Sequence, residues 1–276
     1  MIRATAIVDQ KTMALLQLAA AQKRALAVGA ISVVGAPAPA TSAAVVDAAP
    51  AAPRWTAPDG VGFVELLDTF GDDLTVVNAA RVSFAKESTA MTDRDGKLIK
   101  YLADHDHVTP FFHPQARFRI KMPIFVAREW YRHQIGFARN EVSRRYVDSR
   151  PECWSPRPAD IRARDPRAKQ GSREEPAAEA DRLAAVIAEQ NERAIALYEE
   201  LLTAGVAPEV ARTVLPQGMY TEFIETGSLA AYARLCGLRL GPDAQREIQA
   251  YAGAVSELMK AGFPVSWAAL SREGSC

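Results

Sequence analysis

The chain has 276 residues, of which 49% are hydrophobic and 24% are charged, values that are typical of a folded globular protein and exclude a disordered or collagen-like chain. Its 33 basic and 33 acidic residues give a net charge of zero, which argues against a protein that coats nucleic acid. Three widely spaced cysteines argue against a disulfide scaffold and a Cys-rich zinc site, and they fit a reducing, cytoplasmic compartment.

Residues 1–53 differ from the rest, because they contain 18 alanines, four prolines and no aromatic residue. Ala25 to Val46 carry no charge, so membrane insertion or export is an alternative. Pro37 and Pro39 interrupt this run, however, and small residues dominate it. We therefore expect an Ala/Pro-rich extension that is flexible or loosely helical, with no membrane role, followed by one folded domain at 54–276.

The hydrophobic pattern after Trp55 predicts the elements in chain order. A strand is expected at 62–69, helices at 74–84 and 97–105, a strand at 116–120, and a helix from Pro123 to about Gln134 that stops at Gly136. A strand at 142–147 and a loop rich in Pro and Arg at 149–176 come next. Further helices are expected at 179–202, 208–215, 229–236 and 243–259, with a strand at 219–224. Helices around a small antiparallel or mixed sheet indicate an α+β fold.

Charge is segregated along the chain although it sums to zero. Residues 117–169 hold 14 basic and six acidic residues, whereas residues 174–200 hold two basic and eight acidic ones. A basic centre beside an acidic helix predicts a site for a small anion or a contact between subunits, and the alternative is a set of solvated faces.

Two neighbouring segments carry candidate site residues. The spacing of Glu129, Arg132 and His133 places them on one face at the end of a predicted helix. The alternative is that Arg132 and His133 only offset the negative end of the helix dipole. In the next segment, alternation would place Glu141, Ser143 and Arg145 on one face of a strand. Guanidinium and hydroxyl groups together suit a phosphate, so a phosphate-bearing ligand near Arg132, Ser143 and Arg145 is predicted. The alternative is an Arg-rich edge strand protected against aggregation.

Five segments along the chain make it similar to a known family. Arg132-His133-Gln134 followed by Ser143-Arg144-Arg145-Tyr146 resembles the signature of the flavin-dependent thymidylate synthases. The stretch 107–113 resembles the family's His-x-Thr-Pro-Phe-x-His element, and 123–128 its helix leading into the signature. The run 211–216 resembles its Ala-Arg-x-x-Leu-Pro element, and Leu238-Arg239 with 244–248 its late arginine region. The resemblance spans roughly Trp55 to Leu270.

The resemblance implies an α+β catalytic domain at 54–276 that methylates deoxyuridylate (dUMP) to thymidylate. Methylenetetrahydrofolate would supply the carbon and NADPH the hydride, through FAD, in a homotetramer with shared active sites. Arg239 would contact the uracil ring and act catalytically by stabilising negative charge on it. The residues implied in dUMP binding are Glu129, Arg132, Glu141, Ser143, Arg144, Arg145, Arg212 and Arg239. Those implied in FAD binding are Thr109, Arg132, His133, Gln134, Glu141, Ser228 and Arg234.

The sequence also departs from the family pattern. Gln134 stands in place of the third signature residue, Arg, and eight residues rather than seven separate it from Ser143. Phe112 stands where Glu is frequent, and Arg234 is a candidate substitute for Asn and Arg residues that are absent after Ser228. These differences concern flavin contacts and leave the reaction class unchanged.

The sequence leaves two other functions open. An Arg-rich nucleic-acid-binding protein would use the stretch 117–167, but Phe125, Trp130 and Tyr131 fall mainly on a predicted helix rather than in an exposed stacking surface. A metal-dependent hydrolase would use His105, His107 and His113, but no His-x-x-x-His pair or Cys supports such a site. We therefore expect no bound metal and no nucleic-acid partner.

Overall fold

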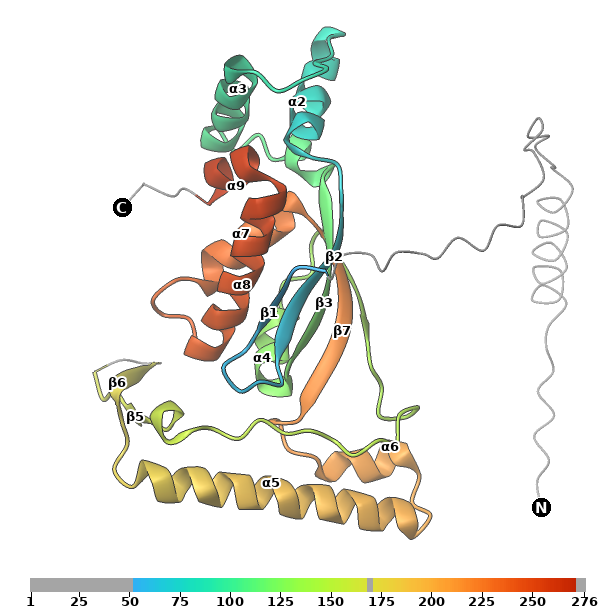
Figure 1. Ribbon diagram of the computed structural model, residues 1–276, viewed down its shortest axis with the longest axis vertical. Coiled ribbons are helices and arrows are strands. Elements are labelled where there is room, and N and C mark those ends of the chain that lie inside the picture. Colours follow the sequence, from blue (N-terminus) through green and yellow to red (C-terminus); the bar gives the residue numbers. More distant parts are fainter. Residues whose placement is uncertain (1–51, 168–170, 272–276) are drawn as a thin grey trace, which may run out of the picture. The chain divides into compact units, whose positions relative to one another are not determined.

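A five-stranded sheet forms the centre of the fold in the computed structural model, which describes residues 52–167 and 171–271. The strands are β1 (Arg54–Thr56), β2 (Phe63–Phe70), β3 (Gln115–Pro123), β4 (Phe137–Glu141) and β7 (Tyr220–Ser228). Their order is β1-β2-β3-β7-β4, and every neighbouring pair is antiparallel (Figure 1). The prediction of an α+β fold is confirmed. Residues 1–51 of the predicted extension lie outside the described residues.

The central strand β3 shows why the sheet has one buried face. Ala116, Phe118 and Ile120 are buried, while Arg117 and Arg119 between them are exposed. This alternation of period two places every apolar side chain on one side of the strand. The outer face is polar, with Arg117 paired to Asp68 and Arg119 to Glu222, each at 2.5 Å.

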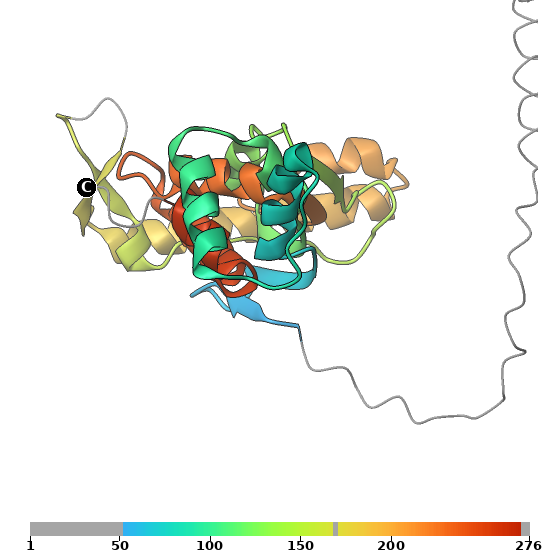
Figure 2. The same cartoon turned by 90° about the horizontal axis from the view of Figure 1, so that it is seen from above.

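Helices pack on the buried face and at one end of the sheet. They are α2 (Asp73–Arg81), α3 (Asp93–Asp104), α4 (Ile124–Trp130), α7 (Leu229–Arg239), α8 (Arg246–Gly262) and α9 (Pro264–Leu270). In Figure 1, α7, α8 and α9 lie along the same side of the sheet. The core between these layers contains the fully buried side chains of Trp130, Phe118, Tyr232 and Trp267. Figure 2 looks down on the end of the sheet where α2 and α3 pack against α9.

Asp73 links α2 to α9 at this end. Its carboxylate accepts hydrogen bonds from the backbone N–H groups of Val265 and Ser266, at 2.9 and 2.8 Å. Helix α9 has no side-chain cap of its own, so a residue distant in the sequence satisfies its first N–H groups. Both α9 and the short strand β1 were absent from the sequence-based expectation.

The helix α5 (Ala180–Thr203) confirms the helix predicted at 179–202. It buries Ala184, Ile195 and Tyr198 and runs across one end of the sheet, next to α6 (Pro208–Ala211). The predicted loop at 149–176 contains the short strands β5 (Arg162–Arg164) and β6 (Ser172–Pro176), which pair as a hairpin.

Two predicted helix boundaries were wrong for local reasons. The helix expected at 97–105 begins at Asp93, because Thr92 and Asp95 form a capping box and residues 93–96 make the first helical turn. The helix expected to reach Gln134 ends at Trp130, where the N–H of His133 turns back to the Trp130 carbonyl at 3.1 Å. Pro123 is extended and precedes this helix rather than lying in its first turn.

Candidate functional site

Arg239 lies at the end of α7 and is held by two residues of the α4 region. Its Nε donates to Nε2 of His133 at 2.9 Å. Its terminal nitrogens reach the Glu129 carboxylate at 3.4 Å and the Glu129 carbonyl at 3.1 Å. The structure therefore brings together three predicted site residues from segments 106 to 110 positions apart.

Positive charge surrounds His133. Burial, followed by the charges of Arg239, Arg234, Arg139 and Arg132, lowers the pKa of His133 to about 4. The imidazole is therefore neutral at pH 7 and can accept the hydrogen bond from Arg239. We call Arg132, Arg139, Arg234 and Arg239 the arginine cluster, because the charges of all four act on His133. Arg139 and Arg239 are paired with Glu225 and Glu129, whereas Arg132 and Arg234 are exposed donors that favour an anionic ligand.

The loop after His133 packs against α7 and is hydrogen-bonded to it. Arg234 donates to the Ile135 carbonyl at 2.6 Å, and Ser228 caps α7 by accepting from the N–H of Ala231 at 3.2 Å. Gly136 has a φ of +84°, and a Cβ there would lie 2.9 Å from the Ala231 Cβ, so both its conformation and the close approach require glycine. This packing fixes the backbone beside the predicted FAD residues His133 and Gln134.

The other predicted FAD residues are less closely joined. Gln134 and Arg132 are exposed at the loop surface. Thr109 begins the short helix η2 (Thr109–Phe112), whose Phe112 ring lies near Gly136. Glu141 lies apart, at the end of β4. The residues present fit a flavin dinucleotide, because exposed guanidinium groups are ready donors for its phosphates and Nη2 of Arg139 is buried without a hydrogen-bond partner among the described residues.

A separate hollow of about 370 Å³ is lined by four of the eight residues implied in dUMP binding. It is lined by Glu141, Ser143, Arg144 and Arg212, together with Tyr220 and Thr221 of β7. Thr221 donates its hydroxyl hydrogen to Glu141 at 2.5 Å, and Arg144 donates to the Ser149 carbonyl at 2.5 Å. We refer to this space as the nucleotide hollow, because the family resemblance implies that Glu141, Ser143, Arg144 and Arg212 bind the nucleotide.

The strand predicted at 142–147 is wrong. Strand β4 ends at Glu141, and the Ser143 carbonyl accepts from the N–H groups of Tyr146 and Val147 in a turn instead of extending the sheet. Ser143 and Glu141 still line one hollow, but Arg145 does not line it. Arg145 pairs instead with Glu209 at 3.1 Å, so the three side chains do not share a strand face.

Arg239 and the nucleotide hollow occupy different places in one chain. Among the residues that the structure describes, no hydrogen bond or ion pair joins Arg239 to Ser143, Arg144 or Arg212. Tyr131 lies between the two regions: burial and then the charge of Glu141 raise its pKa far above the usual value, and Arg139 lies 5.5 Å from its ring centre. The predicted site residues therefore fall in two regions of the chain, one around Arg239 and one in the nucleotide hollow.

Sequence reasoning missed Tyr131, Arg139, Tyr220 and Thr221. Arg139 forms an ion pair with Glu225, a carboxylate that is completely buried and also accepts from the Trp130 indole at 3.1 Å. The only signal for Arg139 was its place in the basic stretch 117–169, and nothing in the sequence indicated Tyr220 or Thr221 as site residues.

The three remaining histidines do not gather into a metal site. In the described part of the chain, no group of three or more His, Cys, Asp or Glu side chains is placed to hold a metal ion. His105 lies against the ring of Tyr101, with 4.1 Å between ring centres. Within the same residues, no helix is both long and apolar enough to cross a membrane.

Comparison with known proteins gives a consistent result. The family model described as "Thymidylate synthase complementing protein" matches residues 65–265. A flavin-dependent thymidylate synthase of Thermus thermophilus is 41% identical over 208 residues, covering 75% of each chain. One of Kosmotoga olearia is 41% identical over 212 residues, covering 75% of this chain and 89% of the relative.

Solved structures agree with these relatives. The crystal structure of the UMP/dUMP methylase PolB from Streptomyces cacaoi with 5-Br dUMP superposes with a TM-score of 0.68 at 29% identity, over 76% of this chain and 94% of that one. The same enzyme with 5-Br UMP gives a TM-score of 0.64 at 28% identity over the same shares. The chain therefore belongs to the thymidylate synthase complementing protein family, that of the flavin-dependent thymidylate synthases.

Proposed function

We propose that the protein methylates dUMP to thymidylate, with methylenetetrahydrofolate as carbon donor and NADPH as the source of hydride through FAD. The observation that supports this most directly is the position of Arg239, held by His133 and Glu129 within the arginine cluster. When bound, the flavin supplies the redox chemistry, while the protein supplies orientation and electrostatics.

Arg239 is suited to act on the pyrimidine ring. Three hydrogen bonds to His133 and Glu129 fix its guanidinium group, so little reorganisation is needed when charge develops nearby. A fixed cation stabilises negative charge on the uracil ring, which makes a ring carbon nucleophilic. His133 contributes as a neutral acceptor that orients Arg239 without adding a competing positive charge.

The nucleotide hollow is suited to the phosphate end of dUMP. Arg212 and Arg144 supply guanidinium donors and Ser143 a hydroxyl donor. Since Arg239 does not line this hollow, we propose that the protein assembles as a homotetramer in which Arg239 of one subunit completes the hollow of another. Each site then takes its ring-binding and phosphate-binding groups from different subunits.

Product formation tests the proposal. Purified protein is stripped of flavin and incubated with dUMP, methylenetetrahydrofolate and NADPH, with and without FAD, and thymidylate is sought by mass spectrometry. We expect thymidylate only when FAD is present. Arg239→Ala is expected to fold and bind FAD but to form no product. Product without FAD, or normal turnover by Arg239→Ala, would overturn the assignment.

A further inference from the structure

Tyr131, the residue that follows α4, packs on the strand pair formed by β4 and β7. Its ring lies edge-on to Phe223, with 5.1 Å between the ring centres. Phe223 is paired with Glu141 across the two strands, so their side chains share one face of the sheet. Arg139, two positions before Glu141, is on the same face, and its guanidinium carbon lies 5.5 Å from the Tyr131 ring centre. The end of α4 therefore places Tyr131 beside the polar side chains of β4.

The carboxylate of Glu141, which lines the nucleotide hollow, is held on one side only. Its Oε1 accepts from the Thr221 hydroxyl at 2.5 Å. Within the part of the chain that the structure describes, no hydrogen bond or ion pair reaches its Oε2. An ionised carboxylate has about four lone-pair positions, so a donor at Oε2 would fix the direction of the group.

The hydroxyl group of Tyr131 is such a donor. It is buried and has no hydrogen bond of full geometry among the described residues. After burial, the nearby Glu141 raises the pKa of this hydroxyl far above its usual value, both by its charge and as a hydrogen-bond acceptor, so the hydroxyl keeps its proton. An unsatisfied buried hydroxyl costs free energy. Tyr131 and Glu141 therefore each have an unused half of the same hydrogen bond.

We propose that Tyr131 is a positioning residue for nucleotide binding: its hydroxyl donates to Oε2 of Glu141 while Thr221 donates to Oε1. The proposal rests on the proposed function, because it takes dUMP as the occupant of the nucleotide hollow. A carboxylate held by two donors accepts from the nucleotide without first losing rotational freedom, so the bound arrangement forms at a lower entropic cost.

Tyr131→Phe tests this role, because it removes only the hydroxyl oxygen. That oxygen has no partner of full geometry, so the variant is expected to fold with unchanged or higher stability. The dissociation constant of dUMP, measured by titration calorimetry on the FAD-loaded protein, should rise about five- to tenfold. The kcat at saturating dUMP should stay within about twofold of wild type. A merely structural role would change the unfolding free energy and leave the affinity for dUMP unchanged.

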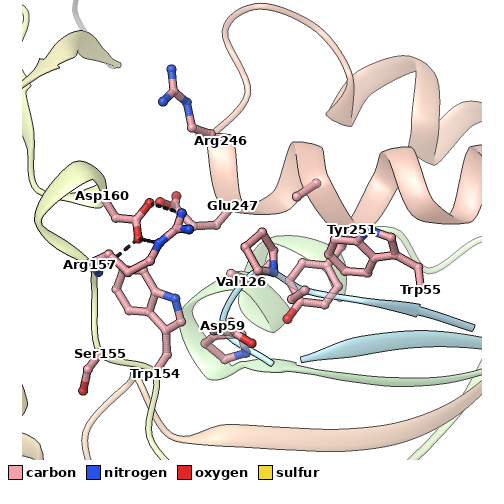
Figure 3. A pocket seen from close by; sticks show the side chains of 14 residues that line it. Trp55, Asp59, Val126, Trp154, Ser155, Arg157, Asp160, Arg246, Glu247 and Tyr251 are labelled. Atoms are coloured by element: carbon pink, nitrogen blue, oxygen red, sulfur yellow. Dashed lines mark hydrogen bonds and ion pairs between the residues drawn. The ribbon is translucent and has the colours of Figure 1, made fainter. Parts of the chain in front are cut away.

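Tyr251→Phe is the matched control, since the Tyr251 hydroxyl is also buried without a partner in the described residues. Figure 3 shows the Tyr251 ring beside Trp55, in a cavity that shares no lining residue with the nucleotide hollow. This variant removes the same atom at a distant place and should leave the affinity for dUMP unchanged.

A double variant tests whether Tyr131 acts through Glu141. Glu141→Ala is expected to weaken dUMP binding by itself, and saturation-transfer NMR measures the weaker dissociation constants. Adding Tyr131→Phe to Glu141→Ala should change the dissociation constant by less than about twofold, because the group that Tyr131 positions is gone.

The proposal is overturned if Tyr131→Phe binds dUMP as tightly as wild type, if Tyr251→Phe weakens binding equally, or if the loss persists in the Glu141→Ala background. Thymidylate formation is scored separately. An active wild type with unchanged affinity in Tyr131→Phe would overturn the positioning role alone. A wild type that binds dUMP without methylating it would overturn only the proposed function, and one that does not bind dUMP would overturn both.

Discussion

The hydrogen bond from Arg239 to His133 requires a neutral imidazole, because the accepting Nε2 must carry a lone pair. Protonation of His133 would place a fifth positive charge inside the arginine cluster and remove the acceptor. The lowered pKa of His133, about 4, and the orientation of Arg239 are therefore two consequences of one arrangement.

This arrangement predicts a pH-dependent contribution to stability. The pKa of His133 is about 4 in the folded protein, against 6.5 for an unperturbed histidine. As the pH falls, the unfolded chain therefore binds this proton before the folded protein does. The contribution is fully present above pH 6.5 and is lost as the pH falls toward 4. Compared with His133→Gln, wild type should lose about 2 to 3 kcal/mol of unfolding free energy between pH 7.5 and 4.5.

Urea unfolding of both proteins at the two pH values measures this difference. His107→Gln, a change at an exposed histidine, controls for the substitution itself. If wild type and His133→Gln lose the same unfolding free energy between the two pH values, His133 does not cause the pH dependence of stability.

At the scale of elements, strand β7 carries two different Arg–Glu pairs. Glu225 on its inner face is completely buried and pairs with Arg139 of β4, whose side chain is 15% exposed. Glu222 on its outer face pairs with Arg119 of β3, which is half exposed. One strand therefore carries one Arg–Glu ion pair that is buried and another that is exposed to solvent. Burial raises the pKa of Glu225 while the Arg139 charge opposes that rise.

Removing each arginine should have very different effects. Arg139→Ala leaves the Glu225 carboxylate buried without its counter-charge, so we expect a loss of about 3 to 5 kcal/mol in unfolding free energy. Arg119→Ala breaks an exposed pair and should cost less than about 1 kcal/mol. Chemical denaturation of both variants gives the comparison, and similar losses would show that burial does not set the strength of these pairs.

The same contrast explains how much of the fold could be predicted from the sequence. β3 is recognisable because burial on one side leaves apolar and charged residues in alternation. The segment 142–147 has valines at its two ends and two adjacent arginines in its middle, so it offers no continuous apolar face, and it forms a turn. Helix α9 could not be predicted, because its N-terminal N–H groups are satisfied by Asp73, nearly 200 positions earlier.

Candidate site residues follow the same logic. Glu129 and His133 are close in sequence and both contact Arg239. The helix ends at Trp130, however, so the helical face predicted to hold Glu129, Arg132 and His133 is not formed. The contacts of Glu129 and His133 with Arg239 join segments 110 and 106 positions apart, and no local pattern encodes them. The resemblance to the family named Arg239, whereas the structure shows which groups hold it.

At the scale of the whole molecule, the separation of Arg239 from the nucleotide hollow predicts that subunits complement one another. Arg239→Ala and Arg212→Ala should each abolish thymidylate formation, for different reasons. In mixed oligomers, a site that joins the intact hollow of one variant to the intact Arg239 of the other is complete. Random 1:1 assembly makes about a quarter of the sites complete, so activity should recover to about that fraction of wild type.

The two variants carry different tags and are co-expressed, and mixed oligomers are purified through both tags. As the control, the variants are assembled separately and then combined without subunit exchange. Recovery in the mixed sample alone would establish that Arg239 and Arg212 act from different subunits. Complete inactivity of verified mixed oligomers would mean that both arginines serve the same chain. The two regions would then have to close on each other within one subunit when the nucleotide binds.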